Sequence, residues 1–329
     1  MPDAALGYGD PRGTMELRTA LADYLGRVRG VLTHPDRIVI MSGSRQALSL
    51  ICRVLAAQGA RRVAHESPGW RLQRDAALDA GLEPIAAPVD AQGLDHSNVQ
   101  ADAICVTPAH QFPTGVALAP ERRGVLVAWA RQHAALIIED DYDSEFRYDR
   151  EPIGALQGLA PDAVAYIGTA AKTLAPGLRI AWAVLPERLA PVVAQAKSRA
   201  DRGTPVIEQL VLADFIQRGG LDRHLRRTRL RYRRRRDAFV AALGEQLPEA
   251  RVEGIAAGLH IVAHLEYGDE RALVAALRRA GISAEGLKEH GARHDAAPAL
   301  VLGYANVPEA AAPAAVSDLV AVLQNGSWR

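Results

Sequence analysis

Residues 164–179 read VAYIGTAAKTLAPGLR, an apolar run that leads into a stretch of small residues with one lysine. The run Val164 to Ile167 predicts a buried strand, and the residues after it predict a loop at the carboxyl end of that strand. Lys172 is the only charged residue between Asp162 and Arg179. Such a lysine is expected to be desolvated, which favours the neutral amine that attacks carbonyl carbons. The alternative is a surface lysine whose amine reaches water.

Lysine is rare in this chain. The 39 basic residues include three lysines, Lys172, Lys197 and Lys288, and all the others are arginines. Arginine keeps its proton permanently, whereas a lysine amine can lose it and act as a nucleophile. A lysine in such a chain is therefore a candidate for chemistry that arginine cannot perform.

The first two thirds of the chain alternate between strand and helix patterns. Predicted strands occupy 38–41, 63–64, 85–87, 104–106, 134–138, 164–167 and 180–185, and predicted helices occupy 14–29, 44–55, 70–80 and 120–132. This rhythm predicts an α/β fold with a mostly parallel central sheet and helices on both faces.

The last third predicts a smaller α+β lobe. Its predicted helices occupy 205–218, 221–243, 270–280 and 310–323, and its predicted strands occupy 260–265, 282–284 and 300–302. We therefore expect a large domain over 1–215 with a short N-terminal arm, and a long helix with a smaller domain over 216–329.

Composition excludes several classes of protein. The net charge of the 329-residue chain is +1, which does not favour a nucleic-acid or membrane-surface protein. Two cysteines in apolar stretches exclude a disulfide scaffold and a cysteine-rich zinc site, and they fit a reducing compartment. The sequence shows neither a signal-peptide pattern nor an apolar run of about 18 residues. We expect a cytoplasmic protein with no membrane partner.

The segment from Arg223 to Arg236 contains nine arginines, with His224 and Tyr232 among them. One interpretation is a helix that binds nucleic acid or phosphate. The other, which the balanced charge of the whole chain favours, is a solvated helix whose Leu221 and Leu225 contact the body of the protein.

Residues 42–46, SGSRQ, follow the predicted strand 38–41 and open a helix. Small residues let the backbone approach an anion, and the free N–H groups of a helix N-terminus bind it. The alternative is an ordinary strand-to-helix turn capped by Ser44.

Three consecutive carboxylates, Glu139 to Asp141, follow the predicted strand 134–138. Strand alternation places Asp140 and Tyr142 on one face of the sheet and the other two acids on the opposite face. Adjacent carboxylates repel one another, which costs stability unless a cation or a proton donor compensates their charge. The segment has no spaced histidine pair, so we predict no metal site, and surface acidity is the remaining alternative.

These three segments together match the needs of pyridoxal 5′-phosphate (PLP). Its aldehyde needs an amine, its pyridine nitrogen needs a carboxylate that keeps it protonated, and its phosphate needs N–H groups and an arginine. In an α/β sheet all three would lie at the carboxyl ends of the strands.

The motifs resemble those of the fold-type I aminotransferases of class I and II, and most closely the aminotransferase-like domain of MocR-type regulators in the GntR group. The resemblance covers nearly the whole chain. It is carried by the segments GYGDPRGTMELRTALADYL, SGSRQAL, ESPGW, TPAHQFPTG, IIEDDYDSEFRY, YIGTAAKTLAPGLR and LRRTRLRYRRRRDA. It implies the fold of a PLP-dependent transferase with PLP as the cofactor, and it assigns the arginine-rich segment to a helix of that fold rather than to DNA.

Four residues take roles around the cofactor ring by this resemblance. Lys172 corresponds to the lysine that forms the internal aldimine and moves protons. Asp140 corresponds to the partner of the pyridine N1, and Tyr142 to the donor to the phenolic O3′. Trp70 corresponds to the aromatic residue that stacks on the ring.

Five residues take roles around the phosphate. Ser44, Arg45, Thr169 and Arg179 correspond to phosphate ligands. Tyr8 resembles the tyrosine that reaches the phosphate of a partner subunit, so a homodimer is implied.

The chain departs from the aminotransferase pattern at three places. Phe112 stands where aminotransferases carry the asparagine that holds O3′, so His110 or Gln111 is expected to share that task. Ala171 replaces a serine before the lysine. Residues 299–304 contain no arginine for the α-carboxylate of a substrate.

The resemblance implies a domain that senses an amino compound through an external aldimine, as the effector domain of a MocR-type transcriptional regulator. One alternative is a stand-alone aminotransferase that interconverts amino acids and 2-oxo acids, and another is a cofactor-free scaffold for dimerisation. Regulators of this group begin with a winged-helix module, whereas this chain begins near the Tyr-Gly-Asp-Pro segment. We therefore expect no DNA binding by this chain alone.

Overall fold

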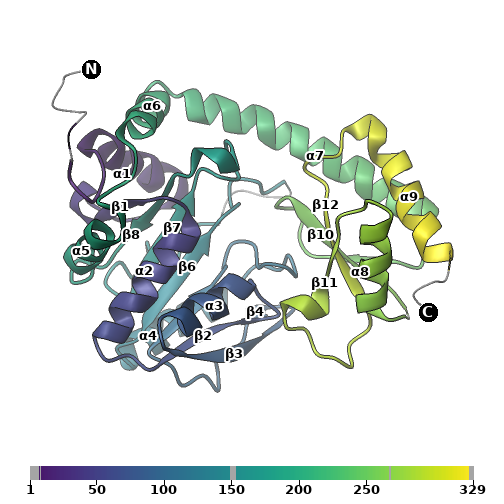
Figure 1. Ribbon diagram of the computed structural model, residues 1–329, viewed down its shortest axis with the longest axis horizontal. Helices are drawn as coiled ribbons and strands as arrows, with labels where there is room; N and C mark the ends of the chain where they lie inside the picture. Colours follow the sequence, from purple (N-terminus) through teal and green to yellow (C-terminus); the bar gives the residue numbers. More distant parts are fainter. Residues whose placement is uncertain (1–6, 8, 149–152, 267, 326–329) are drawn as a thin grey trace.

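The computed structural model describes residues 7, 9–148, 153–266 and 268–325. Two lobes lie side by side, and one long helix runs along the edge of both (Figure 1). The larger lobe contains the central sheet, and the smaller lobe contains an antiparallel sheet covered by helices.

The described part of the large lobe forms an eight-stranded sheet in the order β1-β8-β7-β6-β5-β2-β3-β4. Strands β3, β2, β5, β6 and β7 run parallel, whereas β8 is antiparallel to both β1 and β7, and β4 is antiparallel to β3. The strands are β1 Ile38–Met41, β2 Arg62–Ser67, β3 Glu83–Asp90, β4 Gly93–Leu94, β5 Ala103–Val106, β6 Leu136–Asp141, β7 Val164–Thr169 and β8 Ala181–Val184. The predicted mostly parallel sheet is confirmed.

Helices cover both faces of this sheet, as predicted. One face packs against α2 (Ser44–Ala57), α3 (Arg71–Asp79) and α5 (Ala190–Asp201). The opposite face packs against α1 (Met15–Arg29), α4 (Pro120–Gln132) and α6 (Val206–Gln217). Burial of apolar side chains on both faces explains why the strands read as continuous apolar runs.

Helix α1 shows how local sequence sets an element. The Thr14 side chain accepts a hydrogen bond from the Leu17 N–H at 3.3 Å, and Gly30 ends the helix with a left-handed conformation, φ 66°. Leu17, Leu21 and Leu25 are spaced one turn apart and buried in the core.

The small lobe has a four-stranded antiparallel sheet in the order β11-β12-β10-β9. Its strands are β9 Arg251–Glu253, β10 His260–His264, β11 Glu285–Gly286 and β12 Ala299–Gly303, and its helices are α8 (Glu270–Arg279) and α9 (Ala312–Gln324). The strand predicted at 282–284 is wrong, because β11 begins at Glu285, one residue after the predicted strand ends. Ile282 and Ala284 pack into the apolar core of the lobe, whereas the ladder with β12 begins at Glu285.

Helix α7 (Gly220–Gln246) connects the two lobes. Leu221 and Leu225 near its start belong to the core of the large lobe. Phe239 and Leu243 near its end belong to the core of the small lobe. The arginine-rich segment is therefore part of a structural helix, and the division of the chain at 215/216 stays a prediction.

Candidate functional site

A pocket of about 180 Å³ lies at the carboxyl ends of the parallel strands. Strands β5, β6 and β7 end there, α2 begins there, and the loop from β7 to β8 borders it. It is lined by Ser44, Trp70, Thr107, Phe112, Asp140, Tyr142, Thr169, Ala171 and Lys172. The structure thus brings six of the predicted site residues together around one cavity.

The three acids that end β6 separate as strand alternation predicts. The Glu139 carboxylate accepts hydrogen bonds from the backbone N–H groups of Leu156 and Gln157, both at 2.9 Å. The Asp141 carboxylate accepts one from Arg29 Nε at 2.8 Å and another from the Tyr166 hydroxyl at 2.7 Å. Both acids therefore have hydrogen-bond partners inside the large lobe, and Asp141 is also paired with the Arg29 guanidinium.

Asp140 faces the pocket and lacks such compensation. Its Oδ1 atom is buried and has no hydrogen-bond partner among the described residues. Burial, reinforced by the negative charges of Asp141, Asp143 and Glu66, raises the pKa of Asp140 to about 8, although Lys172 acts in the opposite direction. Asp140 is therefore a buried carboxyl group that would be stabilised by a cation or a hydrogen-bond donor in the pocket.

Tyr142 brings a hydroxyl group to the same cavity. Its oxygen lies 3.1 Å from His110 Nδ1, and the same nitrogen lies 2.9 Å from Asp143 Oδ2. Burial and the nearby Asp143 and Asp140 raise the pKa of Tyr142 well above its ordinary value, so the hydroxyl keeps its proton. His110 does not line the pocket but lies behind Tyr142, which it can orient.

Gln111 is the other residue expected to help hold O3′ in place of the asparagine that aminotransferases carry. Its Nε2 donates to the carbonyl of Pro68 at 2.9 Å and to Glu66 Oε2 at 3.2 Å. Its Oε1 accepts from the Thr114 hydroxyl at 2.7 Å. Its Nε2 also donates to the carbonyl of Phe112 at 2.6 Å, so of the two candidates His110 is the one in contact with the Tyr142 hydroxyl.

The loop from β7 to β8 contains Lys172 and brings Arg179 to the corner where α2 begins. Arg179 in that loop donates from Nη2 to the carbonyl of Ser42 at 2.6 Å. Gly43, with φ 123°, lies against the same guanidinium group, and a Cβ atom there would come within 2.5 Å of Nη2. The backbone at the start of α2 therefore needs glycine to accept the arginine.

Helix α2 begins at this corner without a side-chain cap. Gly43 is the N-cap residue and no side chain accepts from the first turn, so the alternative in which Ser44 caps the turn is wrong. Free N–H groups at a helix N-terminus attract anions. Thr169 lies at the end of β7, where its hydroxyl accepts from the Ala171 N–H at 3.1 Å. The Arg45 side chain is exposed and outside the pocket lining.

Two residues near the pocket were missed in the sequence. Thr107 lines the pocket, and its hydroxyl donates to Glu66 Oε2 at 2.5 Å. Burial raises the pKa of Glu66 to about 7, with hydrogen bonds from Thr107 and Gln111 acting against it. Glu66 is the next-to-last residue of β2, and Thr107 directly follows β5. The rule that ligands bind at the carboxyl ends of strands could therefore have found both residues.

The other lysines have different surroundings. Lys197 is buried, and its Nζ lies 2.6 Å and 2.7 Å from the two carboxylate oxygens of Asp201. Lys288 lies in the small lobe, outside the pocket lining. Lys172 is thus the one lysine of the three that reaches this cavity. Tyr8 lies outside the described residues.

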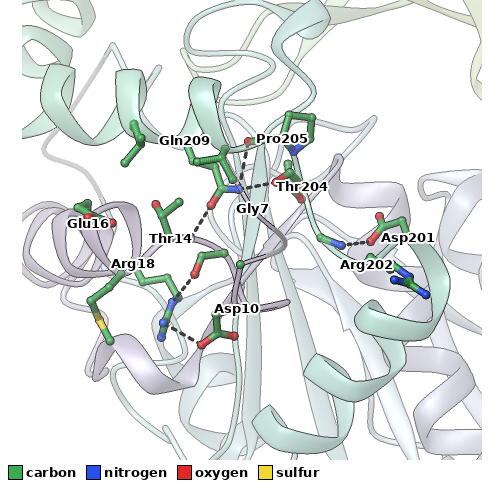
Figure 2. A pocket seen from close by; sticks show the side chains of 16 residues that line it. Gly7, Asp10, Thr14, Glu16, Arg18, Asp201, Arg202, Thr204, Pro205 and Gln209 are labelled. Carbon is green, nitrogen blue, oxygen red and sulfur yellow. Dashed lines mark hydrogen bonds and ion pairs between the residues drawn. The ribbon is translucent and has the colours of Figure 1, made fainter. Parts of the chain in front are cut away.

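A second, larger groove of about 790 Å³ lies between the N-terminal segment and residues 201–210. Figure 2 shows the Gln209 amide bridging its two sides: Oε1 accepts from the Thr14 N–H at 2.8 Å, and Nε2 donates to the Thr204 carbonyl at 2.7 Å. The groove shares no lining residue with the pocket around Lys172. Its walls come from the two chain segments that flank α1 and α6.

Within the described ranges, no group of three or more His, Cys, Asp or Glu residues is arranged to hold a metal ion. No helix there has both the length and the apolar character that a membrane span requires.

The chain is similar in sequence to a known family and to known proteins. The family model "Aminotransferase class I and II" matches residues 2–291. The HTH-type pyridoxine biosynthesis transcriptional regulator PdxR of Corynebacterium glutamicum is 33% identical over 92% of this chain and 66% of its own length. The probable rhizopine catabolism regulatory protein MocR of Rhizobium meliloti is 33% identical over 92% of this chain and 62% of its own length. The chain therefore spans slightly less than two thirds of these relatives.

A solved structure shares the fold over nearly the whole chain. The kynurenine aminotransferase of Pyrococcus horikoshii, solved in complex with PMP, has a TM-score of 0.87 and 28% identity over 98% of this chain and 83% of that one. Both lobes are therefore those of a fold-type I aminotransferase.

Proposed function

The chain belongs to the family of class I and II aminotransferases, and from that premise we propose that it binds PLP in the pocket around Lys172 and senses an amino compound there. The proposal extends to its biological setting, the effector-binding part of a transcriptional regulator. It is supported by the site geometry and by the printed names of relatives that match 92% of this chain.

The observation that carries the cofactor assignment is the unpartnered Oδ1 of Asp140. A buried carboxyl group without a partner costs stability, and a protonated ring nitrogen placed against it would remove that cost. Asp140 lies across the same cavity from Lys172, which carries the amine that the aldehyde requires. The donor set therefore fits the cofactor.

Several other residues in and beside the pocket would also contact the cofactor. Tyr142 would donate its hydroxyl proton to the phenolic oxygen, and Trp70 would cover a face of the ring. Ser44, Thr169, the first turn of α2 and Arg179 would hold the phosphate. When bound, PLP withdraws electrons from the α-carbon of an amino compound, and Lys172 is placed to remove and return a proton at that carbon.

A second candidate is an enzyme that completes transamination. It is favoured by the likeness to an aminotransferase solved with its substrates, and by a pocket that contains both the acid and the lysine that proton transfer needs. The two candidates share one site and differ in whether the amino group is transferred or only recognised.

We also propose a homodimer. Helix α6 exposes Ile207 and Val211, which are 55% and 64% accessible, while its opposite face is buried in the core. A helix that is apolar on both faces is usually covered on both. The groove in Figure 2 is lined by other residues of α6, Val206, Gln209 and Leu210, together with residues before and at the start of α1. By the family resemblance, Tyr8 is expected to reach the partner's site.

Titration with PLP followed by visible spectroscopy tests the proposal. We expect a saturable absorption band that disappears in Lys172→Ala, followed by spectral change when a matching amino compound is added from a panel. Conversion of added amino acid into its 2-oxo acid would assign the second candidate. The absence of any band would leave a cofactor-free scaffold and overturn both.

A further inference from the structure

Helix α7 presents a row of arginines to solvent. Arg223, Arg227, Arg231 and Arg234 follow one another at spacings of four, four and three residues, which places them on one face of the helix. All four are exposed, and Arg226 lies exposed beside them. We call these five residues the arginine ridge. Figure 1 shows α7 along the outer edge of the molecule.

The apolar side of α7 fixes which way the ridge points. Leu221, Leu225 and Thr228 are buried against the large lobe. These residues repeat at the helical period, and the ridge occupies the opposite face. The ridge is therefore held outward by packing on both lobes and does not depend on a flexible segment.

The ridge lacks neutralising partners in the described part of the chain. No carboxylate there forms an ion pair with any of its five guanidinium groups, and Arg223 instead donates to the carbonyl of Arg218 at 3.1 Å. The nearby acids pair elsewhere: Asp222 with Arg27, and Asp237 with Arg233 and Arg236. The sequence favoured a solvated helix and no DNA binding by this chain alone, and the absence of ion-pair partners for the ridge among the described residues is the observation that leads away from that expectation.

Such an arrangement destabilises an isolated helix. Like charges at spacings of three and four residues repel one another, and a surface that serves only solubility mixes both signs. A ridge of one sign is instead typical of a surface that meets a polyanion.

We propose that the arginine ridge binds the phosphate backbone of duplex DNA, which rests on the proposed regulatory function. The twelve residues of helix from Arg223 to Arg234 span about 16 Å, a length along which each DNA strand presents about five phosphates. Guanidinium groups bind phosphate oxygens in pairs of hydrogen bonds. Beside its arginines the face holds one apolar residue, Leu230, and we propose that the guanidinium groups contact phosphates, which carry no sequence information.

The test compares two variants of equal charge. The ridge variant carries Arg223→Gln, Arg227→Gln, Arg231→Gln and Arg234→Gln, and glutamine preserves helix propensity. The control variant carries glutamine at four exposed arginines on other helices and loops, Arg53, Arg61, Arg271 and Arg279. Binding to a fluorescent duplex of random sequence is measured by anisotropy at several salt concentrations.

We expect wild type and control to bind at low salt and to lose about a hundredfold in affinity between roughly 50 and 200 mM salt. The slope of log K against log salt should fall by about 3 to 4 in the ridge variant, because each lost phosphate contact removes about 0.9. Equal slopes in the ridge and control variants would overturn the proposal. So would ridge-dependent binding of polyglutamate at the same affinity, which would assign the ridge to acidic polypeptides.

The PLP absorption band is recorded for every variant. A normal band with no ridge effect refutes the DNA contact alone. A ridge effect without any band refutes the cofactor proposal alone.

Discussion

Replacing Asp140 with asparagine should stabilise the cofactor-free protein and weaken its hold on PLP. The carboxyl group is buried, with a pKa of about 8 in place of 3.8. Between these two values the folded state keeps a proton that the unfolded state releases, so stability falls as pH rises, by about 1.4 kcal/mol per unit. Below pH 3.8 both states are protonated and this cost vanishes, and above pH 8 it is constant. Asparagine does not titrate, so the variant does not lose stability in this way as the pH rises.

The magnitude follows from the same two values. At about 1.4 kcal/mol per pH unit, keeping Asp140 neutral costs about 3 kcal/mol more at pH 7 than at pH 5. The difference in free energy of unfolding between Asp140→Asn and wild type should therefore grow by about 3 kcal/mol over this range. Urea unfolding of the cofactor-free protein at pH 5, 6 and 7 measures it.

The matched control is Asp23→Asn, which removes an exposed carboxylate from α1. Its effect should stay constant over the same range. A pH-independent difference for Asp140→Asn would refute a buried, protonated Asp140. Unchanged affinity of this variant for PLP would separately refute its role beside the ring nitrogen.

Three further substitutions have defined outcomes. Arg179→Ala should raise the dissociation constant for PLP about ten- to a hundredfold, since a charge-assisted hydrogen bond contributes about 1.5–3 kcal/mol; unchanged affinity in a spectral titration would place the phosphate elsewhere. Gly43→Ala should also weaken PLP binding, because its Cβ would lie 2.5 Å from Arg179 Nη2; tight binding would show that the arginine can move freely. Arg29→Met should lower the free energy of unfolding by about 3–5 kcal/mol, because Asp141 would remain as an uncompensated buried charge; a loss below about 1 kcal/mol in urea unfolding would contradict that ion pair.

Features with a short-range cause were predictable from the sequence. The alternation of strands and helices follows from apolar periodicity, and the structure confirms the mostly parallel sheet with helices on both faces. The opposite orientations of Asp140 and Asp141 follow from the two-residue period of a strand. The position of Lys172 follows from its place in the loop after β7.

Features that join distant segments were not predictable. The Arg29–Asp141 ion pair connects residues 112 positions apart, and no local sequence pattern predicts it. The engagement of Gln111 with Glu66 depends on the packing of β2 beside β5, which the sequence leaves open. The shift of the last small-lobe strand to Glu285 reflects a ladder only two residues long, too short to leave an alternating pattern.

The amine that holds the cofactor can be identified chemically. The protein is saturated with PLP, reduced with borohydride, digested and mapped by mass spectrometry. We predict a phosphopyridoxyl label on Lys172 alone, since Lys197 is buried against Asp201 and Lys288 lies outside the pocket. A label on Lys197 or Lys288 at comparable yield, or full labelling of the Lys172→Ala variant, would contradict it.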